Sequence, residues 1–201
     1  MDKYLNQLNK KQLLCSLCAL FFCLIVNFGS TQFIYRYFPN RFVNPDLLFI
    51  IDNPPVYLEY ISETFFILCG LIFFIYLIKY GFNKLHVYLN TISITYVVRG
   101  LFTMLTPMMR PTGVELPSHG FLRDYFVQAG MFPSGHIALI ALIYFFIDIK
   151  KDKFIKYLYL ISFILSTITM VISKGHYSID VVGGILIAYV VYNEISKRIE
   201  L

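Results

Sequence analysis

The sequence predicts an all-α membrane protein with six transmembrane helices and both termini on the cytoplasmic side. Its composition is the first reason, because 58% of its 201 residues are hydrophobic and only 14% are charged. Soluble domains are about half apolar and about a quarter charged. The second reason is that its long apolar segments are hydrophobic on every side instead of along one stripe. The third is an uneven distribution of lysine, which predicts the orientation.

The expected helices follow from charge-free runs of about 17–25 residues, the length needed to cross a bilayer. They lie at 13–35, 56–78, 85–107, 134–149, 154–172 and 177–195. The first run is expected to be a membrane span and not a cleavable signal peptide, because it is too long and no small-residue cleavage site follows it. We recognise no internal repeat, so we expect a single polytopic membrane domain over residues 1–201.

Basic residues near the span ends predict which side faces the cytoplasm. With six spans, one side collects most of the cations: Lys3, Lys10, Lys11, Lys79, Lys84, Lys150, Lys151, Lys153, Lys156, Lys197 and Arg198. This side is predicted to be cytoplasmic. The two long loops, about 36–55 and 108–133, lie on the opposite side. Long loops often carry function, so a site is expected at the outer face.

The charge and the cysteines exclude several other classes of protein. The net charge of +5 is the ordinary cytoplasmic bias of a membrane protein and needs no nucleic-acid partner. The four cysteines, Cys15, Cys18, Cys23 and Cys69, lie at apolar depth and are expected to act as small hydrophobic residues. Cys15 and Cys18 form a CxxC pattern, but no histidine or acidic residue is near. We expect no metal and no cofactor.

Two histidines mark the candidate site, His136 in the stretch PSGH and His176 in the stretch GHYSID. The chain crosses the membrane twice between them, so both are expected at the outer face. Each lies near the start of a helix, where free backbone N–H groups and the helix dipole favour an anion. In PSGH, Ser134 can cap the helix and Gly135 allows a ligand to approach the backbone. The motif therefore indicates a phosphate cradle beside an imidazole.

Asp180 follows His176 by four residues, a spacing that places both on one helical face. Its carboxylate can accept a hydrogen bond from one ring nitrogen and leave the other free for nucleophilic attack. The alternative is that each histidine is an interfacial side chain and that the His–Asp pair is structural. The occurrence of both motifs on one face, each at a helix start, favours a catalytic site.

The two motifs resemble those of the type 2 phosphatidic acid phosphatase superfamily, which contains membrane lipid phosphatases and phosphotransferases. The stretch HYSIDVV is similar to the last motif of the sphingomyelin synthase branch. RGLFTMLTP at 99–107 resembles the arginine-led motif of that branch, and Pro54 and Pro55 resemble its proline-rich motif. The resemblance covers about residues 53–185, which it implies to be the catalytic core.

Two departures from the phosphatase pattern favour head-group transfer. The phosphatase families carry a lysine, six further residues and then Arg-Pro. Arg110 and Pro111 fit, but the lysine position holds Thr103. The arginine expected six residues before the histidine of the third motif is replaced by Met170. The sphingomyelin synthase branch lacks the same two cations.

Other polar residues are candidates for substrate binding. Arg99 lies inside the third span and is expected to bind phosphate or pair with an acid near the site; the alternative is a structural salt bridge to Asp180 or Glu63. Arg110 is either a phosphate ligand or an interfacial anchor. Lys174 is close to His176 and can supply part of the missing charge.

Three acidic residues complete the set of candidates. Glu59 and Glu63 share a face at the outer start of the second span and can hold a cationic head group or an acceptor hydroxyl, or simply be solvated. Solvation is the expectation for Glu59. Asp124, in the outer loop ahead of PSGH, is a candidate for positioning the substrate.

The resemblance implies a lipid phosphotransferase with its active site on the extracytoplasmic or lumenal face. His176 is then the nucleophile, Asp180 orients it, and His136 acts as general acid and then as general base. The phosphoryl oxygens are held by Ser134, Gly135 and Arg99, with Arg110 or Lys174 in addition. The substrates implied are a phospholipid and a lipid alcohol such as ceramide or diacylglycerol. A lipid phosphate phosphatase and a non-catalytic lipid-binding scaffold are the alternatives.

Overall fold

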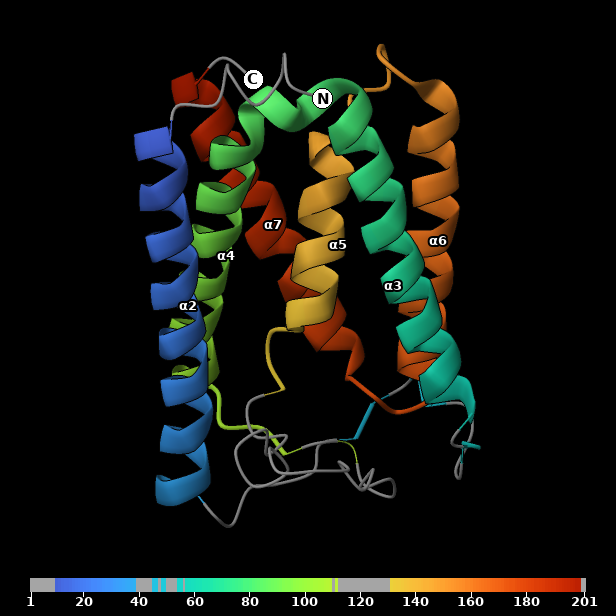
Figure 1. Ribbon diagram of the computed structural model, residues 1–201. Helices are drawn as coiled ribbons and strands as arrows, with labels where there is room; N and C mark the ends of the chain where they lie inside the picture. Colours follow the sequence, from blue (N-terminus) through green and yellow to red (C-terminus); the bar gives the residue numbers. More distant parts are fainter. Residues whose placement is uncertain are drawn as a thin grey trace.

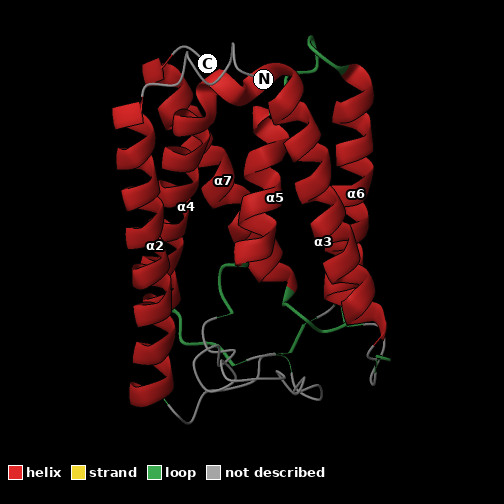
Figure 2. Cartoon of the chain, viewed as in Figure 1, coloured by secondary structure: helices red, strands yellow, loops and turns green. Residues whose placement is uncertain are grey.

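The computed structural model describes residues 10–38, 45–46, 48–49, 54–55, 57–109, 111 and 131–199. Within these residues all regular structure is helical (Figure 2). The α-helices lie side by side as a bundle (Figure 1): α2 (Lys10–Tyr37), α3 (Tyr57–Tyr76), α4 (Leu85–Leu105), α5 (Gly135–Phe146), α6 (Lys153–Ile172) and α7 (Ser178–Ile199). A π-helical turn, η1 (Leu77–Gly81), and a 3-10 turn, η2 (Phe82–Lys84), join α3 to α4. The predicted helical class agrees with this architecture.

Four apolar stretches are long enough to cross a membrane, among the residues described: Lys10–Ile34, Tyr60–Leu105, Lys153–Ile172 and Ser178–Ile195. The second stretch contains both α3 and α4. Large apolar side chains cover the outside of the bundle, including Phe21, Ile67 and Ile161, which are 67%, 60% and 57% exposed. An apolar exterior of this extent is typical of a surface in contact with lipid. These features support a multi-pass membrane protein, while the number of six spans and the cytoplasmic termini stay predictions.

Helix α5 is shorter than the span predicted at 134–149. It has 12 residues and is about 18 Å long at about 1.5 Å per residue, against about 30 Å for the hydrocarbon core. It ends where the backbone of Ile147 becomes extended, and the Lys156 ammonium donates to the Ile147 carbonyl over 2.9 Å. Most of its side chains are buried against α7, α4, α6 and α3. Helix α5 is therefore the central helix of the bundle.

Polar contacts between the outer helices set their pairing. Helix α2 packs on α4, where the Asn27 amide donates to the Tyr96 carbonyl over 2.8 Å. Helix α3 packs on α6, where the hydroxyls of Ser62 and Ser166 donate to each other's carbonyls over 3.3 and 3.4 Å. Small and hydroxylic residues let membrane helices approach closely and bond across the interface. The third pair, α5 and α7, carries the two histidine motifs.

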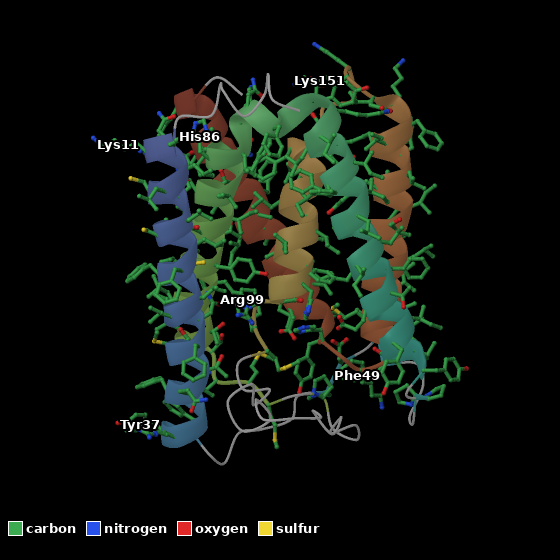
Figure 3. All side chains as sticks on the ribbon, viewed as in Figure 1. Lys11, Tyr37, Phe49, His86, Arg99 and Lys151 are labelled. Atoms are coloured by element: carbon green, nitrogen blue, oxygen red, sulfur yellow. The ribbon has the colours of Figure 1, made fainter. Side chains whose placement is uncertain are left out.

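The two ends of the bundle differ in composition. Lys11, His86 and Lys151 lie at one end, whereas Tyr37 and Phe49 lie at the other (Figure 3). Helices α5 and α7 both begin at the Phe49 end (Figure 1). The expectation that both histidine motifs share one face of the molecule, opposite the lysine-rich turns, agrees with this arrangement.

Candidate active site

Ser134 begins α5 as the sequence predicts. Its hydroxyl oxygen accepts a hydrogen bond from the Ile137 N–H over 3.3 Å and serves as the N-cap, and the residue is fully buried. An N-cap of this kind satisfies one of the free N–H groups of the first turn. His136 therefore projects from the first turn of α5, with 42% of its side chain exposed.

His176 lies two residues before α7, so the predicted sharing of one helical face by His176 and Asp180 is wrong in detail. The contact itself forms: His176 Nδ1 lies 3.2 Å from Asp180 Oδ2. The same oxygen accepts the Tyr177 N–H over 3.0 Å, as the third residue of a helix does when it reaches back to cap the start. This double contact fixes the imidazole and leaves Nε2 as the nitrogen not held by Asp180.

Close packing of α7 on α5 brings the two motifs together. The Ser134 N–H donates to the Asp180 carbonyl over 3.1 Å. A Cβ at Gly184 would lie 2.9 Å from the Ser134 carbonyl oxygen and 3.0 Å from the Ala138 nitrogen, so only glycine permits this approach. As a result the ring centroids of His136 and His176 are 6.3 Å apart. The two imidazoles are therefore close neighbours at the starts of α5 and α7.

Arg99 reaches the site from α4 and supports the PSGH stretch. Its Nε donates to the Pro133 carbonyl over 3.0 Å, and one terminal nitrogen donates to Asn27 Oδ1 over 2.7 Å. A Cβ at Gly135 would lie 2.9 Å from Arg99 Nε, so the space predicted for a ligand beside Gly135 is occupied by the guanidinium. Arg99 also interacts electrostatically with Asp180. It is thus close to both motifs.

Glu63 approaches the site from α3. Its Oε1 lies 4.0 Å from His136 Nε2, and both side chains are partly exposed. The Phe66 ring meets the His136 ring edge to face, with centroids 4.7 Å apart. The structure therefore places a carboxylate and an aromatic ring beside the more exposed of the two histidines.

Of the remaining predicted site residues, the structure describes the side chain of Lys174 alone. Lys174 lies in the turn before His176 with a positive φ of 55°, and its ammonium is 5.5 Å from the centre of the Phe49 ring. Arg110 and Asp124 lie outside the described residues, as does the side chain of Glu59.

Two residues that depart from the phosphatase pattern contact the PSGH stretch or the residue just before it. The Thr103 hydroxyl donates to the Phe132 carbonyl over 3.0 Å and is fully buried. The sulfur of Met170 lies 3.9 Å from the Ser134 hydroxyl. Neither position supplies a cation to the site.

Sequence reasoning missed three residues that hold this site. Asp46 accepts from the N–H and hydroxyl of Ser178 and so caps α7 from a distant loop. Asn27 holds Arg99, and the Tyr96 hydroxyl donates to the Gly135 carbonyl over 3.2 Å. A polar residue inside an apolar span was the available signal for Asn27.

The Asp180 side chain is fully buried, and one of its two carboxylate oxygens accepts hydrogen bonds. Among the residues that the structure describes, its Oδ1 has no hydrogen-bond partner. A buried carboxylate is costly unless its charge is balanced. A positive charge on the adjacent His176 ring would therefore be stabilised at this position. Within the part of the chain that the structure describes, no three or more histidine, cysteine or acidic side chains are grouped so that they could hold a metal ion.

Residues 131–197 match the family model described as PAP2 superfamily C-terminal. The matched segment contains both histidine motifs, Asp180, helices α5 and α6, and α7 up to residue 197. The match supports the PAP2 superfamily, and together with the apolar helices it supports a membrane enzyme of the lipid-phosphatase type. No curated protein matches the chain.

Proposed function

We propose that the protein is an integral-membrane lipid phosphotransferase similar to sphingomyelin synthase. It moves a phospho-head group from a phospholipid to a lipid alcohol such as ceramide or diacylglycerol. The observation that carries the proposal is the pair of imidazoles with ring centroids 6.3 Å apart, one of them held by a buried carboxylate. Such a pair supplies a nucleophile and an acid on opposite sides of one phosphoryl group.

In the first step, Nε2 of His176 attacks the phosphorus of the phospholipid. The bond from phosphorus to the lipid alcohol oxygen breaks, and the electron pair stays on that oxygen. His136 donates a proton to it, so the alcohol leaves neutral. The phosphohistidine ring carries a positive charge beside Asp180, whose buried carboxylate lies 3.2 Å from Nδ1. Arg99, bound to the Pro133 carbonyl just before α5, stabilises the phosphoryl oxygens together with the start of that helix.

In the second step, His136 accepts the proton of the incoming hydroxyl. That oxygen attacks the phosphorus, the P–N bond breaks, and its electron pair returns to His176. Glu63, 4.0 Å from His136 Nε2, orients this imidazole or holds the acceptor. Water in place of the alcohol would give hydrolysis through the same intermediate.

The choice between transfer and hydrolysis rests on the cations that the phosphatase pattern requires. Thr103 and Met170 stand at two of those positions, and both contact the PSGH stretch or its lead-in. A site with fewer fixed cations suits a phosphodiester, which carries one negative charge, better than a phosphomonoester, which carries about two. This supports transfer. The PAP2 match supports hydrolysis of a lipid phosphate monoester or diphosphate as the second candidate.

Feeding the purified protein a labelled phospholipid, with and without ceramide or diacylglycerol, tests the proposal. We expect a labelled head group on the acceptor lipid, and loss of turnover in both His176→Ala and Asp180→Asn. Asp180→Asn should retain more activity, because it removes orientation and charge and leaves the nucleophile. His86→Ala, at the opposite end of the bundle, is the control. Release of the phosphorylated head group into water, in place of its transfer, would favour hydrolysis, and no turnover would favour a lipid-binding scaffold.

We also propose that the histidine motifs face the extracytoplasmic or lumenal side and that the single domain has both termini in the cytoplasm. The support is the gathering of lysines at the opposite end, where Lys11 and Lys151 lie (Figure 3) and where Lys84, Lys150 and Lys156 lie near Lys151. In a background without the four native cysteines, Asp152→Cys should be protected from an impermeant reagent added outside, whereas Lys174→Cys should react. Labelling of position 152 from outside would overturn this topology.

A further inference from the structure

A pocket lies at the end of the bundle opposite the histidines. It has a volume of about 500 Å³ and is formed where α5 ends, between the turn from α3 to α4, the 147–151 turn and α7. We name it the lysine-end pocket. Lys151 marks this end of the molecule, well away from Arg99 (Figure 3). The volume is within the range of about 300–1,000 Å³ found for small-molecule sites.

The lining of the lysine-end pocket is strongly positive. It contains four lysines, Lys84, Lys150, Lys151 and Lys156, against one acidic residue, Asp148. Lys156 is engaged by the end of α5, since its ammonium donates to the carbonyls of Tyr144 and Ile147. Within the described chain, the other three lysines form no ion pair. Their charges are therefore available to an anion.

The one carboxylate that lines the pocket, that of Asp148, already accepts a hydrogen bond from a backbone N–H. Asp148 Oδ1 accepts the Lys150 N–H over 2.9 Å, which closes the turn after α5. The Tyr76 hydroxyl accepts the Asp148 N–H over 3.1 Å and lies 3.4 Å from the Phe146 carbonyl. These contacts fix the backbone of residues that line the pocket.

Two tyrosine hydroxyls supply additional donors. Tyr88 and Tyr192 line the pocket, and Tyr88 is only 3% exposed. Neither hydroxyl makes a hydrogen bond to any residue that the structure describes. The rings of both are held against Phe146, with centroids 4.7 and 5.9 Å away. Because both hydroxyls lack a protein partner in the described chain, an anion in the pocket can accept hydrogen bonds from them.

We propose that the lysine-end pocket binds the phosphate of an anionic phospholipid from the leaflet at this end. Lysines bind phosphate as point charges, and the phenol hydroxyls add neutral donors. A lipid is the favoured source because the exposed apolar faces of α3 and α6 lead to this end, which places a head group at the depth of the lysines. A free phosphate anion offers the same chemistry, and the experiment separates the two sources.

The test uses the full chain in a zwitterionic bilayer nanodisc titrated with phosphatidylglycerol. Each lysine near a membrane surface contributes about fivefold in affinity for an anionic lipid. The triple variant Lys84→Gln, Lys150→Gln, Lys151→Gln should therefore weaken binding by at least about tenfold. A matched control, Lys10→Gln, Lys11→Gln, Lys153→Gln, removes three charges from the same end outside the pocket lining. It lowers the general surface attraction by a similar amount, so the pocket variant should lose clearly more affinity than this control.

A second variant keeps every charge. Tyr88→Phe with Tyr192→Phe removes only the two hydroxyls and should weaken binding by about threefold or more, the effect of lost hydrogen bonds. This variant keeps the test decisive if the lysine variant does not fold. Glycerol 3-phosphate and inorganic phosphate are the soluble probes, and neither should displace the lipid. Equal losses in the lysine variant and its control would overturn the proposal, as would displacement of the lipid by either soluble anion.

Discussion

Replacement of Gly184 by alanine tests the contact that brings the two histidine motifs together. The added Cβ would lie 2.9 Å from the Ser134 carbonyl oxygen and 3.0 Å from the Ala138 nitrogen. Both are backbone atoms, so no side chain can move aside. Ordinary contact begins at about 3.5 Å, so α7 must move away from α5 by about half an ångström.

Two opposing terms decide the expected magnitude. Overpacking of this kind costs about 1–3 kcal/mol, whereas alanine in a helix is favoured over glycine by about 1 kcal/mol. The net loss is up to about 2 kcal/mol, which lowers the melting temperature by up to about 4–8 °C for a chain of this length. The shift also separates Ser134 from Asp180, and a displacement of half an ångström should slow turnover about tenfold.

Gly70→Ala is the matched control, because Gly70 also lies within a helix and a Cβ there meets nothing within 4 Å. The helix-propensity term alone should leave Gly70→Ala equal to or more stable than the wild type. Thermal unfolding in detergent and lipid turnover measure both effects. If Gly184→Ala matched Gly70→Ala in both measurements, the α5–α7 contact could not be the element that positions the motifs.

Three further predictions concern single side chains. His136→Ala should be severely slowed on a phospholipid but much less on a nitrophenyl phosphodiester analogue, whose leaving group needs no proton; equal losses in phosphohistidine formation would remove the acid role. Burial raises the pKa of the Asp46 carboxyl, but hydrogen bonds from Leu48 and Ser178 lower it by more, so the net pKa is lowered. Asp46→Asn should therefore lower the melting temperature above about pH 4, with a difference from the wild type that shrinks as pH falls through the folded pKa; a constant difference would contradict this. Asn27→Leu should reduce turnover by releasing Arg99 while the protein still inserts, and unchanged turnover would show that Arg99 needs no such support.

Features that depend on neighbouring residues could be predicted from the sequence. The helices agree with the charge-free runs to within a few residues at most ends, because burial in lipid requires an apolar segment that satisfies its own backbone. The cap at Ser134 and the contact between His176 and Asp180 join residues at most four positions apart. Contacts at such short range follow from backbone geometry, even though His176 proved to precede the helix.

Features that depend on how helices pack were decided only by the tertiary structure. The Asp46 cap, the contact of Asn27 with Arg99 and the approach of Glu63 to His136 join residues more than 70 positions apart. The short length of α5 depends on its burial among neighbouring helices, which an apolar run does not encode. The hydropathy of a segment indicates that its surroundings are apolar, but it does not distinguish surrounding lipid from surrounding protein. For that physical reason the sequence determined the helices and the two local motifs of this protein, and the packing of α5 on α7 decided that the motifs form one site.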